Sequence, residues 1–269
     1  MNDTPLFPNS TARSVLSMIL FATLLIFLQL HNYLLMIVWG IGVGYSLINK
    51  KMRPFIATTL TFAIGFFLYS YVNSLWIAEI NAQEIRIIFN RLSLLVLLLP
   101  FIVLSLIDRQ RFMYGWLKPQ WTEVVRIPFI WYGFRQTTVS VFLVVAMIMN
   151  FLMFLPFIVL HSEKLVQGIW GFLLLFSILN ALLEEMIWRG ILLYRFSTFF
   201  GNQWAVWITS IGFGLQHYSL GFSWWGCLLF SIGGYFFGAI TVQSKSILPA
   251  VIWHMLFNAM MVLSGMILD

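Results

Sequence analysis

Two adjacent carboxylates lie inside an otherwise apolar stretch of the C-terminal half. The stretch reads NALLEEMIWR, and its acids are Glu184 and Glu185. Neighbouring positions of a helix point about 100° apart, so the two carboxylates face different ways. Arg189 follows Glu185 by four residues, the spacing at which Glu and Arg pair along a helix. We expect that pair to leave Glu184 available for chemistry, with Asn180 one turn before it on the same face.

Two histidines occupy later apolar stretches. His217 ends the segment FGLQH, and His254 begins the segment HMLFN. Asn258 follows His254 by four residues and therefore lies on the same helix face. Counted at 1.5 Å per residue from the nearest inside-facing end of each span, Glu184, His217 and His254 lie about 14 to 20 Å deep. That depth is close to the middle of a hydrocarbon core of about 30 Å. A carboxylate and two imidazoles can deprotonate a water or bind a metal, so we predict one shared site.

A structural interpretation of these groups competes with the functional one. Glu184, Glu185 and Arg189 could form a cluster of ion pairs that only holds helices together. Buried pairs of that kind stabilise poorly, and one arginine cannot neutralise two carboxylates that face different ways. The doublet therefore favours function. The other two histidines, His31 and His161, fall at predicted span ends, where an amphipathic ring is common.

The elements that position these residues must be membrane helices. Of the 269 residues, 61% are hydrophobic and only 9% are charged, and the mean hydropathy is +0.93. Soluble domains carry about 25% charged residues, which excludes a soluble enzyme, a disordered chain and a disulfide-rich secreted module. The single cysteine, Cys227, can form no internal disulfide. The basic residues are scattered between apolar runs, so we expect a lipid bilayer and no nucleic acid as partner.

The apolar runs predict an all-α, polytopic membrane protein with about eight to nine transmembrane helices and the active-site bundle in the C-terminal half. A span needs about 20 apolar residues, and charges, Pro or Gly separate one span from the next. The candidates are 14–30, 33–48, 54–77, 88–107, 137–160, 168–194, 204–217, 222–242 and 247–267. The first is expected to be a retained span, since no convincing cleavage site follows it.

The distribution of Lys and Arg predicts the orientation. With the N-terminus in the cytoplasm, twelve of the fifteen basic residues fall on the cytoplasmic side, and only Arg86, Arg91 and Lys164 fall outside. Short cytoplasmic loops hold such an excess. We therefore expect a multi-pass plasma membrane protein with a cytoplasmic N-terminus.

One long polar connection divides the chain. Residues 108–136 mix aromatic and basic side chains, as expected of an interfacial cytoplasmic connector. It separates an N-terminal four-helix region, 1–107, whose role the sequence does not indicate, from a C-terminal region, 137–269. Glycine pairs four residues apart, Gly40 with Gly44 and Gly234 with Gly238, allow close helix packing.

The motifs together resemble a known family. Glu-Glu-x-x-x-Arg, Phe-x-x-x-His and His-x-x-x-Asn follow one another on successive apolar stretches. This order resembles the CPBP intramembrane proteases, which include the type II CAAX prenyl endopeptidases and bacterial proteins of bacteriocin processing or self-immunity, also called the Abi family. The resemblance covers about 165–268.

The resemblance implies roles for the matching residues. It implies that Glu184 and His217 activate the attacking water, that His254 and Asn258 stabilise the oxyanion, and that Glu185 and Arg189 support them. The family has been described both as metalloproteases and as metal-free glutamate proteases. The residues fit both descriptions: no cofactor is required if Glu184 is the base, while zinc could use Glu184, His217 and His254 with water as fourth ligand.

Other intramembrane hydrolases lack their motifs in this sequence. There is no His-Glu-x-x-His, no Gly-x-Ser-x-Gly and no Asp within a predicted span. We therefore predict an intramembrane endopeptidase that cuts a membrane-associated peptide or protein near the cytoplasmic half of the bilayer. The alternative is a non-proteolytic membrane scaffold or bacteriocin-immunity partner that retains the motif residues. A transporter is less favoured, since the sequence has no visible inverted repeats.

Overall fold

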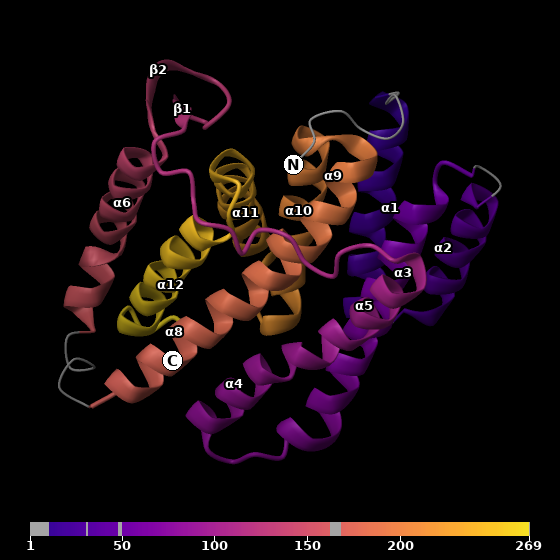
Figure 1. Cartoon of the computed structure of the whole chain (residues 1–269). Coiled ribbons are helices and arrows are strands. Elements are labelled where there is room, and N and C mark those ends of the chain that lie inside the picture. Colours follow the sequence, from indigo (N-terminus) through magenta and orange to yellow (C-terminus); the bar gives the residue numbers. More distant parts are fainter. Residues whose placement is uncertain (1–10, 31, 48–49, 162–167, 269) are drawn as a thin grey trace.

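The computed structural model describes residues 11–30, 32–47, 50–161 and 168–268. Two basic residues discussed above, His31 and Lys164, lie outside the described residues. Helices make up most of the described residues, and they gather into one bundle with a small β-hairpin at one end (Figure 1).

The N-terminal region consists of five α-helices and a short π-helix. They are α1 (Thr11–Gln29), α2 (Tyr33–Ser46), α3 (Arg53–Val72), which continues as the π-helix η1 (Asn73–Ile77), α4 (Gln83–Leu92) and α5 (Leu94–Asp108). The C-terminal region contains the strands β1 (Val124–Pro128) and β2 (Gly133–Thr138). Its helices are α6 (Val139–Leu160), α8 (Trp170–Glu185), the π-helix η2 (Met186–Leu193), α9 (Tyr194–Phe200), α10 (Asn202–Gln216), the 3₁₀ turn η3 (His217–Leu220), α11 (Trp224–Ser244) and α12 (Leu248–Leu263).

Six helices in the described residues are long and apolar enough to cross a membrane. They are Thr11–Gln29, Arg53–Ile77, Gln83–Asp108, Val139–Leu160, Trp170–Phe200 and Trp224–Ser244. Each of the nine stretches predicted as spans contains a helix, but α2, α10 and α12 have only 14, 15 and 16 residues. The prediction of an all-α polytopic membrane protein is confirmed, and the number of complete crossings stays a prediction.

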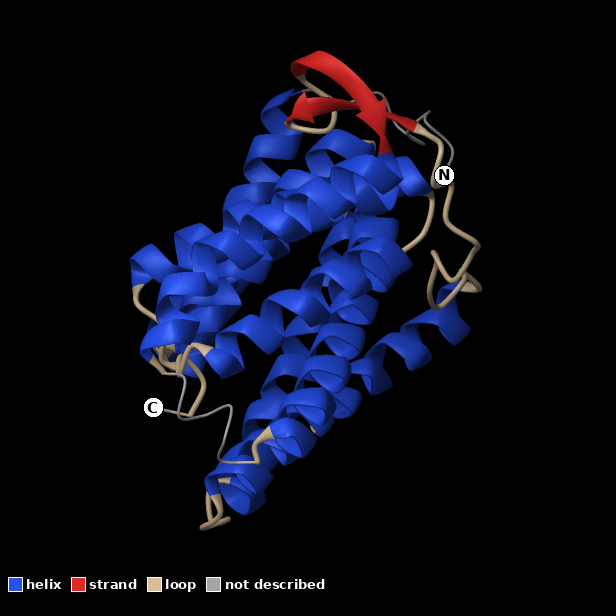
Figure 2. Cartoon of the chain, turned by 90° about the vertical axis from the view of Figure 1, so that its left-hand side faces the viewer, coloured by secondary structure: helices blue, strands red, loops and turns tan. Residues whose placement is uncertain are grey.

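A β-hairpin occupies the end of the connector and was not predicted. Strands β1 and β2 pair antiparallel, with Val124 opposite Thr138 and Ile127 opposite Arg135 (Figure 2). The side chain of Gln243 on α11 donates to the carbonyl of Val124 at 2.9 Å. The hairpin is therefore attached to the C-terminal bundle.

The N-terminal and C-terminal regions share one hydrophobic core. Phe21 of α1 lies 6.3 Å from Trp188 of η2 and 5.3 Å from Phe196 of α9, between ring centroids. Phe62 of α3 lies 5.5 Å from the same Trp188. The first helices thus cover the π-helix that directly follows the carboxylate pair.

Glycines bring α10 and α11 close together. A Cβ atom on Gly234 would lie 3.1 Å from the backbone of Ser210, and one on Gly238 would lie 3.2 Å from the Val206 side chain. Cβ atoms on Gly40 and Gly44 would meet nothing within 4 Å. Of the two glycine pairs in the sequence, only the pair in α11 has the close packing that the spacing allows.

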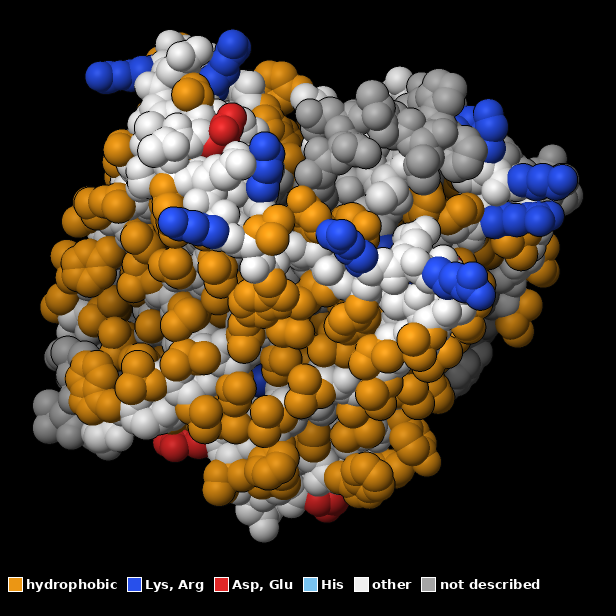
Figure 3. All heavy atoms as spheres, in the orientation of Figure 1, with side chains coloured by type: hydrophobic (Ala, Val, Ile, Leu, Met, Phe, Trp, Pro, Cys, Tyr) orange, Lys and Arg blue, Asp and Glu red, His pale blue; other side chains and the backbone are white. Residues whose placement is uncertain are grey.

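Charge and hydrophobicity separate along the molecule. Lys and Arg side chains lie across the upper part of the visible face, from the hairpin at the upper left to the far right, and a broad hydrophobic band covers the lower part (Figure 3). Helix α4 lies at the opposite end from the hairpin (Figure 1). A hydrophobic band with basic residues at one edge is the surface expected of a multi-pass membrane protein.

Candidate active site

The carboxylate pair stands at the junction of α8 and η2. Glu184 and Glu185 are the last two residues of α8, and both are fully buried. The chain then widens into the π-helix that begins at Met186. Single π-helical turns within α-helices are frequent at functional sites, because they shift the directions in which successive side chains point.

Arg189 forms the ion pair that the spacing predicts. Its Nη1 donates to Oε1 of Glu185 at 2.9 Å, and its Nη2 donates to the carbonyl of Gly234 at 3.1 Å. The guanidinium also lies 4.4 Å from the ring centroid of Phe213. Arg189 therefore joins η2, α10 and α11 behind the carboxylates and is held too firmly to serve Glu184 as well.

A second arginine pairs with Glu184, and this contact was not predicted. Nη1 of Arg91 on α4 lies 3.4 Å from Oε1 of Glu184, and the Arg91 residue is only 8% exposed. From the sequence, Arg91 is assigned to the outer side of the membrane and Glu184 is expected to have no cationic partner. The structure corrects the second expectation, since each buried carboxylate has its own guanidinium partner.

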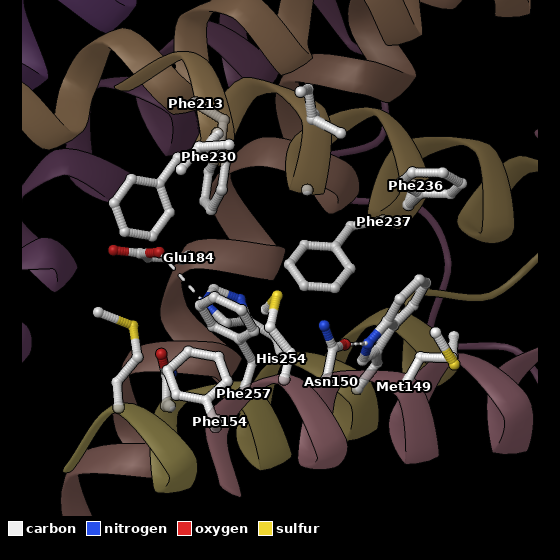
Figure 4. Close-up of a pocket in the computed structure, with 18 of the residues that line it drawn as sticks. Met149, Asn150, Phe154, Glu184, Phe213, Phe230, Phe236, Phe237, His254 and Phe257 are labelled. Carbon is white, nitrogen blue, oxygen red and sulfur yellow. Dashed lines mark hydrogen bonds and ion pairs between the residues drawn. The ribbon is translucent and has the colours of Figure 1, made fainter. Parts of the chain in front are cut away.

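His254 of α12 lies between the two carboxylates. Its Nδ1 is 2.8 Å from Oε1 of Glu185, and its Nε2 is 3.7 Å from Oε2 of Glu184. Figure 4 shows the ring facing Glu184, with Phe237 nearby. Because a carboxylate only accepts, the Nδ1 proton of His254 is donated to Glu185. This contact fixes the tautomer and directs Nε2 at Glu184.

His217 reaches the same site from the end of α10. Its Nδ1 lies 2.8 Å from the carbonyl oxygen of Phe213, and its ring stacks on Phe230 at 3.9 Å between centroids. The carbonyl oxygen can only accept, so Nδ1 carries the proton and Nε2 keeps its lone pair when the ring is neutral. His217 is thereby held as an acceptor.

Five of the predicted site residues line one cavity of about 700 Å³. Most of its wall is aromatic or aliphatic, as the phenylalanines of Figure 4 illustrate. The polar site residues on its wall are Asn180, Glu184, His217, His254 and Asn258. Glu185 and Arg189 are not among the lining residues and stand behind the wall.

Four side-chain atoms of residues on this wall have no hydrogen-bond partner within the described part of the chain. They are Oε2 of Glu184, Nδ2 of Asn258, Oδ1 of Asn180 and Nε of Arg91. Buried polar atoms are nearly always hydrogen-bonded, so groups left open on a cavity wall point to a ligand or to water. An acceptor and a donor on the same wall can serve, respectively, a water molecule and a carbonyl oxygen.

The predicted zinc ligands do not converge as a metal centre in this arrangement. No group of three or more His, Cys, Asp or Glu side chains among the described residues could hold a metal ion. Nδ1 of His254 is engaged by Glu185, and Nδ1 of His217 is engaged by Phe213. The zinc alternative stays a prediction.

Arg91 is the site residue that sequence reasoning missed, although the sequence carries its signal. It lies within the predicted span 88–107, four residues after Ile87 and next to Asn90. A charge inside a span requires a partner or a role. The rule singles out Arg91 as well as Glu184 and Glu185, but the charge count assigned Arg91 to the outer side of the membrane.

Comparison with known proteins gave one match. Residues 166–260 match the family model described as type II CAAX prenyl endopeptidase Rce1-like, in agreement with the resemblance that the motifs indicate. The match contains Glu184, His217, His254 and Asn258, and it leaves α4 with Arg91 outside. A search of curated proteins and a search of solved structures each returned no match.

Proposed function

From this family match, which supports a CAAX-type intramembrane protease in general, we propose that the chain is an endopeptidase that hydrolyses a membrane-associated peptide or protein. The observation that carries the proposal is a pair of buried atoms that lack hydrogen-bond partners, Oε2 of Glu184 and Nδ2 of Asn258, on residues that line one apolar cavity. Peptide hydrolysis in a dry site needs a base for the water and a donor for the oxyanion. These two atoms have those properties.

Glu184 acts as the base in this proposal. Its carboxylate takes one proton from the water, the water oxygen bonds to the carbonyl carbon of the scissile peptide, and negative charge develops on the carbonyl oxygen. The proton then passes from Glu184 to the leaving nitrogen as the C–N bond breaks, and the carboxylate is restored. His217 accepts a second hydrogen bond from the same water through Nε2, which fixes its orientation.

Asn258 and His254 stabilise the negative charge that develops on the carbonyl oxygen. Nδ2 of Asn258 donates to the oxyanion without needing a charge of its own. His254, whose Nδ1 is held by Glu185 at 2.8 Å, presents Nε2 to the same cavity and donates when that nitrogen is protonated. Glu185 orients this imidazole as the carboxylate of a hydrolase triad orients its histidine.

The wall chemistry favours an apolar substrate segment. The cavity of about 700 Å³ is bordered by Phe154, Phe230, Phe236 and Phe257 together with several methionines. Pockets lined in this way bind by apolar burial and use a few polar groups for orientation. We propose that the hydrophobic part of the substrate lies against these side chains, with the scissile bond at Glu184.

A non-proteolytic scaffold is the second candidate, because one observation favours it. The buried formal charges are balanced: Arg91 pairs with Glu184, and Arg189 pairs with Glu185. A balanced cluster can hold α4, α8 and α12 together without any reaction. Such a structural cluster does not explain why polar atoms on the cavity wall lack hydrogen-bond partners.

Cleavage by purified protein in proteoliposomes separates the two candidates. Membrane-anchored peptides are incubated with the wild type, with Glu184→Gln and with Asn258→Ala, and products are identified by mass spectrometry. We expect Glu184→Gln to abolish cleavage and Asn258→Ala to lower kcat by about 100-fold, as loss of one oxyanion donor does. Glu84→Gln, the same change at an exposed position of α4, is the matched control and is expected to cleave normally.

Two further results would decide against parts of the proposal. Full activity of Glu184→Gln would exclude Glu184 as the base, and absence of products from a broad peptide set would favour the scaffold. A parallel series with a chelator tests zinc, for which loss of cleavage restored by Zn²⁺ is the expected sign.

A further inference from the structure

A second cavity adjoins the first and differs from it in chemistry. It encloses about 360 Å³ on the side of α4, and five of its twelve lining residues are polar: Asn73, Arg86, Asn90, Arg91 and Ser219. Five residues line both cavities, namely Arg91, Leu220, Phe222, Met266 and Ile267. The two spaces therefore meet along a shared wall.

Arg91 is the charged residue on that shared wall. Its Nη1 reaches Oε1 of Glu184 at 3.4 Å, while its Nε has no hydrogen-bond partner in the described part of the chain. A guanidinium with an open N–H needs water when no protein acceptor is present. Nε itself is buried, but the residue is 8% exposed and lines the polar cavity, so water in that cavity can contact Arg91.

Hydrogen bonds hold the polar wall in place around Arg91. Nδ2 of Asn73 donates to Oγ of Ser93 at 2.8 Å, and Nδ2 of Asn90 donates to Oδ1 of Asn73. The hydroxyl of Tyr69 donates to Oδ1 of Asn90 at 3.3 Å. These bonds connect α4 to α3 and η1, so hydrogen bonds fix the positions of the polar side chains on this face of α4.

Helix α4 also has the composition of a water-exposed element. Its sequence is QEIRIIFNRL, with Arg86 and Asn90 four residues apart on one face. A polar stripe of this kind inside a membrane protein lines water in preference to lipid. The mouth of the cavity includes the exposed residues Ala78 and Ser219.

We propose that the second cavity is the water-access route to Glu184 and that Arg91 is the positioning residue at its inner end. The inference rests on the proposed hydrolysis, which consumes one water for each peptide bond, whereas the apolar cavity would be filled by substrate. Water then reaches Glu184 from the side of α4 and displaces no bound substrate. Arg91 holds the carboxylate at this junction.

The geometry also sets the side from which water comes. Helix α4 lies at the end opposite the hairpin and the basic surface (Figures 1 and 3). The positive-inside rule assigns the basic end to the cytoplasm. The route then opens on the other side of the membrane. This property can be measured without any activity assay.

Cysteine labelling in sealed proteoliposomes tests the route. Cys227 is the single cysteine of the chain, so Cys227→Ser gives a cysteine-free background. In that background Ala78→Cys and Ser219→Cys place a thiol on two different segments of the mouth, after η1 and in η3. An impermeant anionic methanethiosulfonate is added on one side at a time, since the cavity contains Arg86 and Arg91. Ser177→Cys, at a buried position of α8 that lines neither cavity, is the control.

We expect both mouth cysteines to be labelled only from the side opposite the basic surface, and Ser177→Cys to stay unlabelled. The label at the mouth should lower kcat by about tenfold or more with little change in KM, because it obstructs water and leaves the apolar cavity open. Labelling from the basic side only, absence of labelling, or labelling with unchanged kcat would each overturn the route.

Variants of Arg91 test its part. Arg91→Met is expected to lower kcat by about 100-fold with KM nearly unchanged, and Arg91→Lys is expected to restore part of the loss because it returns the positive charge. Equal loss in both variants with a raised KM would contradict a positioning role. Because labelling is scored on inactive Glu184→Gln protein as well, failure of the route and failure of the proposed hydrolysis remain distinguishable.

Discussion

At the scale of the residue, the site is a network of four buried charges and one bridging imidazole. Glu184 pairs with Arg91, Glu185 pairs with Arg189, and His254 contacts both carboxylates. A balanced pair in a low-dielectric interior gains little stability over a hydrophobic pair, but loss of one member leaves an uncompensated charge. Each member is therefore costly to remove on its own.

Arg189→Met is expected to destabilise the protein by about 3 to 5 kcal/mol, the range for breaking a buried ion pair by removing one partner. The loss includes the bond to the carbonyl of Gly234 and leaves Glu185 without its guanidinium. Unfolding by SDS in mixed micelles, followed by tryptophan fluorescence, measures the change in free energy of unfolding.

Arg135→Met provides the control for that measurement. Arg135 is exposed on β2, and its replacement is expected to change the free energy of unfolding by less than about 0.5 kcal/mol. Equal stability of the two variants would mean that the Arg189 pair contributes nothing to folding.

At the scale of the element, the position of His217 depends on how closely α10 approaches α11. A Cβ atom on Gly214 would overlap the side chain of Ser231 and the backbone carbonyl of Cys227. A backbone carbonyl cannot turn aside, so α11 would have to move, together with the Phe230 ring on which His217 stacks. The close contact of these two helices is thus part of the site.

Gly214→Ala is therefore expected to lower stability by about 1 to 3 kcal/mol, the range for overpacking, and to lower kcat as well. Gly171→Ala on α8 is the matched control, since a Cβ atom there would meet nothing within 4 Å. The SDS unfolding assay and the cleavage assay are applied to both variants. A Gly214→Ala protein as stable and active as Gly171→Ala would show that α11 can shift freely.

Helix periodicity and apolar length predicted most of the elements, because membrane helices are set by local sequence. The hairpin at 124–138 was missed because its strands are short and sit in a segment dominated by interfacial aromatic and basic residues. The π-helix η2 also has no local signal. It depends on tertiary contacts, such as the aromatic packing of Trp188 against Phe62.

The site could be predicted only in part for a related reason. Depth along each span indicated that Glu184, His217 and His254 would lie at one level, and the structure brings all three to one cavity. Which groups pair across helices depends on how the helices are arranged, which one sequence does not reveal. Arg91 with Glu184, 93 residues apart, and His254 with Glu185, 69 residues apart, are contacts of that kind.

At the scale of the whole molecule, helices α1, α3 and α4 contribute to the site although the family match begins at residue 166. They supply Arg91, and through Phe21 and Phe62 they cover Trp188 behind the carboxylates. The hairpin reaches the same cavity from the other end through Ile127 and Pro128. The matched region alone therefore lacks parts of the cavity wall and one of the two arginines that pair with Glu184 and Glu185.

Separate expression of residues 1–136 and 137–269 tests this dependence. The C-terminal piece alone is expected to insert into the membrane and to show no cleavage, because Glu184 lacks Arg91 and η2 lacks its aromatic cover. Co-expression of both pieces should restore cleavage, since transmembrane helices can assemble from separate chains through packing. The same pair with Arg91→Met in the N-terminal piece is the control and should assemble without restoring the rate. Full activity of 137–269 alone would show that the matched region is sufficient and that Arg91 is dispensable.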